Sequence, residues 1–200
     1  MVTNLKPGRG RPRGFDPEAA LAVGQSMFHA HGYEAVGLAA LTEALGIKPP
    51  SFYMAFGSKA GFFGRILERY ARSVLALEEI LLPGRAPDEA LAELLESAAR
   101  TYAADPERRG CLVLEATRGG DDSESAILAR RVAEERRGQI RAFIAASHPA
   151  MAGLVTDFVA CAMSGLSASA REGMNEERLV AVARAHAAVL RLLLQRPDGG

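Results

Sequence analysis

Apolar residues recur every three or four positions through most of the chain, and no segment alternates with the two-residue period of a strand. The longest such pattern follows Ser58 and comprises Phe63, Leu67, Tyr70, Val74, Leu77 and Leu81. This spacing predicts one continuous helix that Ser58 caps and that Pro83-Gly84 ends. The pattern as a whole predicts an all-α fold.

Three shorter helices are predicted before this one. The first begins at Asp16-Pro17-Glu18, with Asp as the N-cap residue and Pro in the first turn, and ends at Gly32. The second covers Leu38 to Leu45 and ends at Gly46. The third begins at Pro49 or Pro50 and ends near Phe56-Gly57. These are three helices within about forty residues.

The remaining chain predicts a larger helical bundle. Every segment after Pro83-Gly84 has helical periodicity, with breaks at Pro87, Asp105-Pro106, Gly119-Gly120, His148-Pro149 and Gly173-Met174-Asn175. We therefore predict a flexible basic arm over 1–14, a three-helix domain over 15–60 and a larger helical domain over 61–200.

Charge is distributed unevenly along the 200 residues. The 24 Lys and Arg balance the 24 Asp and Glu, yet residues 1–75 carry a net charge of +4 and residues 76–200 a net charge of −4. A basic front part suggests a polyanion partner. In the arm, Arg9, Arg11 and Arg13 lie on a Gly- and Pro-rich backbone. They could enter the minor groove beside a major-groove site, or form a tail that only raises nonspecific affinity.

The segment from Leu38 to Phe56 has the design of a helix-turn-helix. Thr42 is a small residue before the turn, Gly46 allows the turn, and Phe52 supplies an apolar plug between the two helices. The second helix would present its first turn to the major groove, where free backbone N–H groups also meet phosphate. A helical hairpin in an unrelated bundle has the same periodicity.

The residues of this segment resemble a known family. Gly32-Tyr33 and then LTEALGIKPPSFYMAFGSKAGFF, from Leu41 to Phe63, are similar to the DNA-binding domain of the TetR family of one-component transcriptional regulators. The resemblance covers about residues 12–70. It implies a helix-turn-helix DNA-binding domain over 15–60 and a helical ligand-binding and dimerisation domain over 61–200. Further along, Arg109–Leu112 and Gly165–Gly173 look like one recurring subgroup of the family's helical domains.

The resemblance implies a set of DNA-binding residues. The start of the recognition helix, which faces base edges and adjacent phosphates, is formed by Lys48, Pro49, Pro50 and Ser51. Tyr53 matches a tyrosine whose hydroxyl reaches phosphate, and Lys59 matches a lysine that opens the fourth helix. Thr42 belongs to the same interface. Gly37 stands where the family usually has Ser or Thr, and Met54 where His or another polar residue is common, so each departs from the family's phosphate contacts.

The resemblance also implies a mechanism. The chain would be a repressor that binds a palindromic DNA operator as a homodimer and is released by a small-molecule effector. The dimer would form through helices at about 149–173 and 176–195, which are rich in small and apolar residues. An effector pocket in the bundle would be lined by Tyr102, Cys111, Leu114, Glu115, Arg118, Phe143, Phe158 and Met163. Glu115 and Arg118 could instead form a surface ion pair.

Cys111 allows an alternative function. It follows Arg108 and Arg109, whose charges would stabilise a thiolate, so the chain could be a helical ligand- or electrophile-sensing protein without specific DNA binding. A buried, unreactive thiol is the other interpretation. With Cys161 as the second of two cysteines, a reducing cytoplasm is expected.

The sequence predicts no enzyme, cofactor or metal, because it contains no nucleophile elbow, phosphate loop or metal-ligand spacing. It also predicts no membrane span, because the best apolar run, Phe158 to Ala170, has 13 residues.

Overall fold

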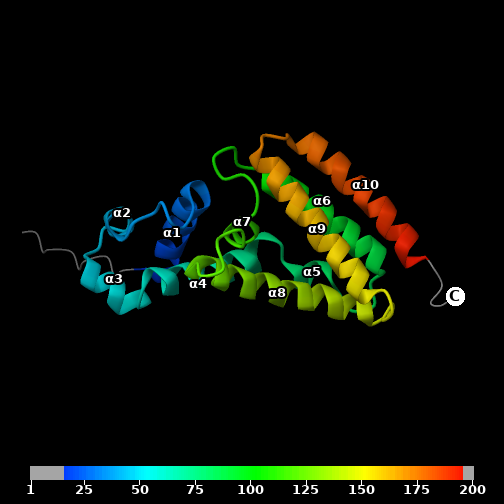
Figure 1. Ribbon diagram of the computed structural model, residues 1–200, viewed down its shortest axis with the longest axis horizontal. Helices are drawn as coiled ribbons and strands as arrows, with labels where there is room; N and C mark the ends of the chain where they lie inside the picture. Colours follow the sequence, from blue (N-terminus) through cyan, green and yellow to red (C-terminus); the bar gives the residue numbers. More distant parts are fainter. Residues whose placement is uncertain (1–15, 196–200) are drawn as a thin grey trace, which may run out of the picture.

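The computed structural model describes residues 16–195 of the chain. Within that range it contains ten α-helices and no strand, which confirms the predicted all-α class (Figure 1). In chain order the helices are α1 (Pro17–His31), α2 (Leu38–Ala44), α3 (Pro49–Phe56), α4 (Lys59–Val74), α5 (Leu77–Ile80), α6 (Pro87–Ala103), α7 (Leu112–Ala116), α8 (Glu124–Ala145), α9 (Ala152–Arg171) and α10 (Glu176–Leu194).

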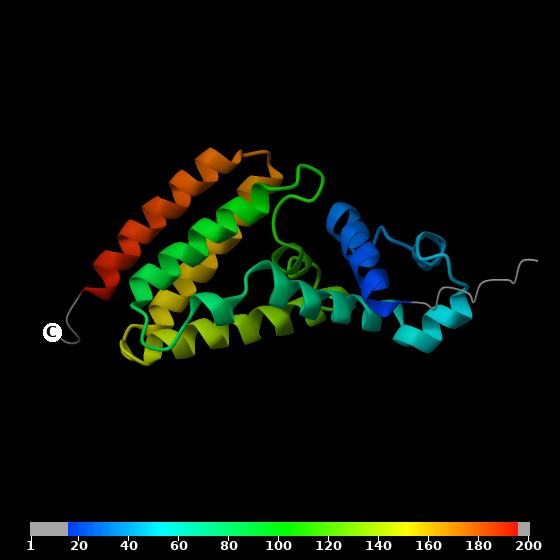
Figure 2. The same cartoon turned by 180° about the vertical axis from the view of Figure 1, so that it is seen from behind.

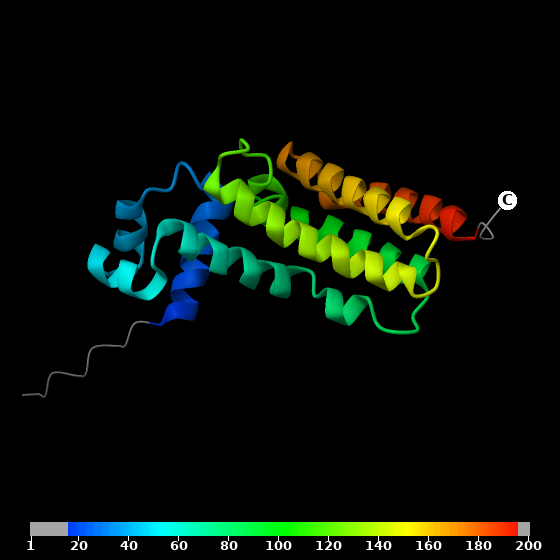
Figure 3. The same cartoon turned by 60° about the horizontal axis from the view of Figure 1, so that its bottom comes forward.

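The helices form two groups along the long axis of the molecule. Helices α1, α2 and α3 gather at one end, while α6, α9 and α10 pack together towards the other (Figures 1 and 2). Helix α4 runs beside α8 and contacts α1 and α3 as well as α7 and α8 (Figure 3). It therefore connects the two groups, and the domain boundary that we place between residues 60 and 61 falls in its first turn.

Aromatic side chains form the core of the N-terminal group. The buried phenylalanines are Phe28, Phe52, Phe56, Phe62 and Phe63. Their rings meet at close range, with 4.4 Å between the centroids of Phe56 and Phe62. Helix α1 crosses α4 at Gly24, where an added Cβ would lie 2.4 Å from the Phe62 ring. The close crossing of α1 and α4 therefore depends on a residue without a side chain.

Local capping signals set the helix boundaries in this group. The Asp16 side chain accepts a hydrogen bond of 2.9 Å from the Glu18 amide, and Pro17 begins α1. Gly32 ends that helix with φ of +81°, a value that favours glycine. The Ser58 hydroxyl accepts a 2.9 Å hydrogen bond from the Gly61 amide and caps α4. These boundaries confirm the predicted ones.

The helix predicted to run without interruption from Ser58 to the Pro83-Gly84 break is divided in two. Helix α4 ends at Val74, and Leu75 and Ala76 leave the helical conformation with ψ of 88° and 84°. The six apolar residues on which that prediction rested are nevertheless buried or half-buried, and Leu75 at the break is buried as well. Periodicity alone does not reveal the break, because the apolar side chains reach the core on either side of it.

The last two helices carry apolar residues on the face that points away from the bundle. Leu154 of α9 is 58% exposed, and Val182 and Val189 of α10 are 39% and 41% exposed. By length and composition alone α9 could cross a membrane, but it packs against α6, α8 and α10 and 39% of its apolar window is buried. This face of α9 and α10 is the bundle surface on which we expect a partner.

Candidate functional site

The α2–α3 unit has the geometry of a helix-turn-helix. Gly46 adopts φ of +63° at the turn, and the Ile47 amide donates a 3.0 Å hydrogen bond to the Thr42 carbonyl. The Thr42 hydroxyl bonds to the Leu38 and Ala39 carbonyls within its own helix, each at 3.0 Å. Thr42 is 6% exposed, so its side chain stabilises the turn rather than reaching the surface.

Helix α3 presents an open surface to solvent. Lys48, Pro49, Pro50 and Ser51 are all exposed at its start. One turn later Tyr53 is 50% exposed and Met54 is 90% exposed, while Phe52 between the helices is fully buried. The structure therefore brings the side chains predicted to meet DNA to one end of the molecule.

The first turn of α3 does not offer the backbone donors that we expected there. Pro49 and Pro50 have no N–H group, and the Ser51 amide donates a 2.9 Å hydrogen bond to the Lys48 carbonyl. The Phe52 amide donates to the same carbonyl at 3.2 Å. None of the first four residues of α3 therefore has a free amide for a phosphate or a base.

Lys59, at the start of α4, lies beside the same surface. Its Nζ atom is 4.0 Å from the centroid of the Tyr33 ring, so a cation–π contact positions the ammonium group. Gly61 follows in the first turn, where an added Cβ would lie 2.6 Å from the Phe56 carbonyl oxygen. The glycine that weakens helix propensity here is needed for α3 and α4 to meet.

Two other predicted residues of this interface have different positions. Gly37 is exposed and is the N-cap residue of α2, which has no side-chain cap. The arm residues Arg9, Arg11 and Arg13 lie outside the described residues.

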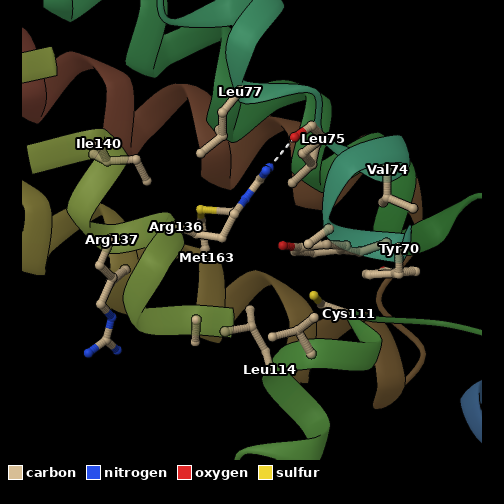
Figure 4. Close-up of a pocket in the computed structure, with 15 residues that line it drawn as sticks. Tyr70, Val74, Leu75, Leu77, Cys111, Leu114, Arg136, Arg137, Ile140 and Met163 are labelled. Atoms are coloured by element: carbon tan, nitrogen blue, oxygen red, sulfur yellow. Dashed lines mark hydrogen bonds between the residues drawn. The ribbon is translucent and has the colours of Figure 1, made fainter. Parts of the chain in front are cut away.

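The bundle contains a cavity of about 90 Å³ between α4, α5, α6, α7, α8 and α9 (Figure 4). Its lining is mainly apolar and consists of Ala71, Val74, Leu75, Leu77, Val113, Leu114, Ala133, Ile140, Ala160 and Met163. Its polar side chains are Tyr70, Tyr102, Cys111, Arg136 and Arg137. Such a cavity suits a small ligand with one polar end.

Arg136 is the charged group that reaches across this cavity. Its guanidinium donates a hydrogen bond to the Leu75 carbonyl, on the opposite wall (Figure 4). That carbonyl is available because α4 ends at Val74, so no helical amide takes it. Burial lowers the pKa of the guanidinium, and the charge of Glu78 opposes this effect. The break after α4 therefore creates the acceptor that positions Arg136.

Arg136 is not among the predicted pocket residues, although the sequence contains a signal for it. It lies four residues after Val132 and four before Ile140, both of which are buried. A charged residue at an apolar position of a helix indicates a buried polar role. The preceding and following charges, in the run RRVAEERRGQ, obscured this spacing.

Cys111 and Tyr102 lie in the cavity wall as predicted, together with Leu114 and Met163. The Cys111 amide donates a 2.9 Å hydrogen bond to the Ser167 hydroxyl. Burial raises the pKa of the Cys111 thiol, which lowers its thiolate fraction at neutral pH. The environment thus favours the interpretation of Cys111 as an unreactive thiol over a sensor.

Four other residues predicted to bind the ligand are absent from the cavity lining. Glu115 is on the opposite side of α7, where it accepts from Ser167 at 3.2 Å and pairs with Arg171 at 3.4 Å. Arg118 is 54% exposed and lies 3.8 Å from Glu115, as in the ion-pair alternative. Phe143 lies two turns of α8 beyond Arg136, and Phe158 packs against His186 on the outer face of α9 and α10. Glu115 and Phe158 thus lie on other faces of their helices, whereas Phe143 lies beyond the end of the cavity along α8.

A polar junction joins the cavity wall to α1. His29 Nε2 lies 3.2 Å from the carbonyl oxygen of Gly110, the residue before Cys111. Because a carbonyl only accepts, Nε2 carries the proton. Arg171 at the end of α9 donates to the His29 carbonyl at 3.3 Å. Burial, followed by the charge of Arg171, lowers the pKa of His29 to about 4.

Within residues 16–195 no group of three or more His, Cys, Asp or Glu side chains is arranged to hold a metal ion.

Comparison with known proteins identifies relatives along nearly the whole chain. The HTH-type transcriptional repressor BdcR of Escherichia coli K12 is 41% identical over 187 residues, which are 93% of this chain and 94% of that protein. The HTH-type transcriptional repressor ComR of the same organism is 33% identical over 196 residues, covering 90% of each chain.

A solved structure also matches. A cysteine mutant of the TetR family transcriptional regulator CifR, complexed with a 26-bp double-strand operator DNA, aligns with a TM-score of 0.74 and 36% identity over 89% of this chain and 98% of that one. Residues 20–66, which include α2 and α3, match the family described as bacterial regulatory proteins, tetR family. The chain therefore belongs to the TetR family of transcriptional regulators.

Proposed function

We propose that this regulator is a repressor that binds a two-fold symmetric operator as a homodimer and releases it when a small molecule occupies the bundle cavity. The observation that carries the proposal is the exposed side-chain surface of α3, held by a buried core at one end of the molecule. The repressor names of the relatives BdcR and ComR, and the operator complex of CifR, support it.

The DNA contacts follow from the exposed surface of α3. Lys48 and Ser51 lie at the helix start, where they reach base edges and phosphates in the major groove. The half-exposed Tyr53 directs its hydroxyl to the backbone, and Lys59 approaches phosphate from the start of α4. Met54, at 90% exposure, offers an apolar contact to a thymine methyl group.

The proposed dimer forms through the outer faces of α9 and α10. Leu154, Phe158, Cys161 and Gly165 follow one another by four, three and four positions on α9. Val182, His186 and Val189 have the same spacing on α10. Together they form a continuous stripe of small and apolar residues, which a second copy would cover symmetrically. Operator half-sites would then lie about one helical turn apart, roughly 34–36 Å.

Coupling between cavity and DNA is supported by the junction at His29. Cys111 lines the cavity, and Gly110 next to it is bonded to His29 of α1, whose helix packs on α4. A ligand that binds the released conformation more tightly would shift the equilibrium away from the operator-bound form. A regulator of this kind acts where the chromosome is, in the cytoplasm.

The test is selection of genomic fragments by the purified full-length protein near physiological salt, followed by sequencing. We expect a two-fold symmetric site that is retained by the wild type and lost with Tyr53→Ala or Lys48→Ala. Size-exclusion chromatography with light scattering should show that these variants remain dimers. Salt-sensitive retention without a common site would contradict specific operator binding.

A further inference from the structure

Arg136 is a half-buried cation whose charge has no ion-pair partner. Among the ion pairs formed within residues 16–195, none includes its guanidinium, and one N–H group goes to the neutral Leu75 carbonyl. Glu78 acts on it only at longer range and is exposed. The next residue, Arg137, is by contrast 48% exposed and lies 4.0 Å from Glu134. Holding a partly desolvated cation without an anion is unfavourable.

A second polar group in the same cavity is also unsatisfied. The Tyr102 side chain is fully buried, and its hydroxyl has no hydrogen-bond partner among the described residues. Burial, followed by the Cys111 thiol, raises the pKa of this hydroxyl, and Arg136 lowers it. Tyr102 and Arg136 line the same cavity. Buried hydroxyl groups are normally hydrogen-bonded, so an unpaired one in a cavity that also holds an unpaired cation points to a missing acceptor.

The rest of the cavity wall limits the size and the polarity of the molecule that carries this acceptor. Val74, Leu77, Ile140 and Met163 give the cavity an apolar side, and its volume is about 90 Å³. An apolar protein cavity of roughly 150 Å³ accommodates benzene. The cavity described here therefore has room for about three to five non-hydrogen atoms.

We propose that the cavity binds a short-chain carboxylate, whose charged group pairs with Arg136 and accepts a hydrogen bond from Tyr102 while its hydrocarbon end lies against the apolar wall. The proposal deepens the proposed function by naming the chemical class of the effector, and it rests on that function only for the regulatory consequence of binding. A neutral ligand of the same size would leave the Arg136 charge unpaired.

The first experiment is isothermal titration calorimetry of the full-length protein with formate, acetate, propionate, butyrate and hexanoate. Propionamide, which has the shape of propionate without its charge, is the matched neutral probe. We expect the tightest binding near propionate and at least tenfold weaker binding of propionamide. Equal affinity for propionate and propionamide would overturn the proposal, as would no detectable binding of any carboxylate up to about 10 mM.

Three variants locate the site. Arg136→Gln should weaken propionate binding about tenfold or more. Arg141→Gln, at an exposed position of the same helix outside the cavity, is the matched control and should bind as the wild type does. Tyr102→Phe removes only the unpaired hydroxyl and should weaken binding about threefold to tenfold without loss of thermal stability. Tyr102→Phe therefore decides the question even if Arg136→Gln fails to fold. Wild-type affinity in Tyr102→Phe and Arg136→Gln would place the carboxylate elsewhere and contradict the proposal.

Operator binding, measured independently by fluorescence anisotropy, distinguishes failure of the carboxylate site from failure of the proposed repressor function. Propionate binding with operator release would support both. Propionate binding without release would support the carboxylate site and contradict its effector role. Specific operator binding by a protein that takes up no carboxylate would overturn the inference and leave the repressor function standing.

Discussion

The Nε2 atom of His29 donates a hydrogen bond of 3.2 Å to the carbonyl oxygen of Gly110, 81 residues further along the chain. Gly110 has φ of +80°, and an added Cβ there would lie 3.0 Å from the Ser167 carbonyl oxygen. The contact thus joins α1 to a tightly packed loop whose next residue lines the cavity. Through this hydrogen bond, the N-terminal helices and the cavity wall are in direct contact.

Acidification should destabilise the protein through His29. Because the folded-state pKa of about 4 lies below the ordinary 6.5, the neutral form stabilises the fold above pH 6.5, and this stability is lost as the pH falls towards 4. We expect a loss of about 2 kcal/mol between pH 7.5 and pH 5, measured by urea unfolding. His29→Gln should reduce this loss. His31→Gln, at an exposed position of the same helix, should retain it; equal pH profiles for all three proteins would contradict the assignment.

Gly24 and Gly138 should respond oppositely to alanine. At Gly24 a Cβ would lie 2.4 Å from the Phe62 ring, so Gly24→Ala should destabilise the fold by about 1–2 kcal/mol despite its better helix propensity. At Gly138 in α8 no atom lies within 4 Å of the added carbon, and Gly138→Ala should stabilise by up to about 1 kcal/mol. Chemical denaturation measures both. A stabilising Gly24→Ala would show that α1 and α4 are not in close contact.

Charge on the outer face of α10 should separate the proposed dimer. The double variant Val182→Arg and Val189→Arg should sediment as a monomer and lose about a hundredfold or more in operator affinity, because one subunit engages only one half-site. Ile127→Arg changes an apolar residue of similar exposure, 55%, on α8. This control should remain dimeric. Monomers in both variants, or dimers in both, would argue against an interface at α10.

Lys48 should act through charge at the start of α3. If it meets phosphate, Lys48→Gln should weaken binding to all sequences and reduce the slope of log affinity against log salt by about one. If it reads a base edge, binding should weaken mainly at the cognate operator. Arg141→Gln, an exposed change on α8, should alter neither property. A Lys48→Gln protein with wild-type binding would exclude this residue from the interface.

Removal of residues 1–13 tests the basic arm. If Arg9, Arg11 and Arg13 contact DNA, the truncated protein should bind the operator more weakly and with a shallower salt dependence. Titrations at several salt concentrations measure both quantities. An unchanged slope would show that the arm makes no phosphate contact.

The elements that the sequence predicted correctly are those with local causes. Asp16 and Ser58 cap their helices through atoms two or three residues away, and Gly32 and Gly46 end helices by their own backbone conformation. None of these effects depends on the rest of the fold. The helix boundaries of the N-terminal group could therefore be read from neighbouring residues.

The features that the sequence did not predict depend on distant residues. The break at Leu75 involves Arg136, which lies 61 residues away. The positions of Glu115 and Phe158 depend on how α7 and α9 are rotated about their axes, and that of Phe143 depends on how far the cavity extends along α8. Core and ligand-lining positions share the same apolar residue types. Recognition of the family identified the α3 surface but not the chemistry of the cavity, where Arg136 became apparent only from the packed bundle.

Helix α4 begins with Lys59 beside the α3 surface and ends with Tyr70 and Val74 in the cavity wall. Its 16 residues span roughly 24 Å at 1.5 Å per residue. If a ligand tilted this helix by about 5° about its cavity end, Lys59 would be displaced by roughly 2 Å. The symmetric motion in a second subunit would change the distance between the two α3 helices by up to twice that amount. A ligand of only a few atoms is therefore large enough to put a pair of half-sites out of register.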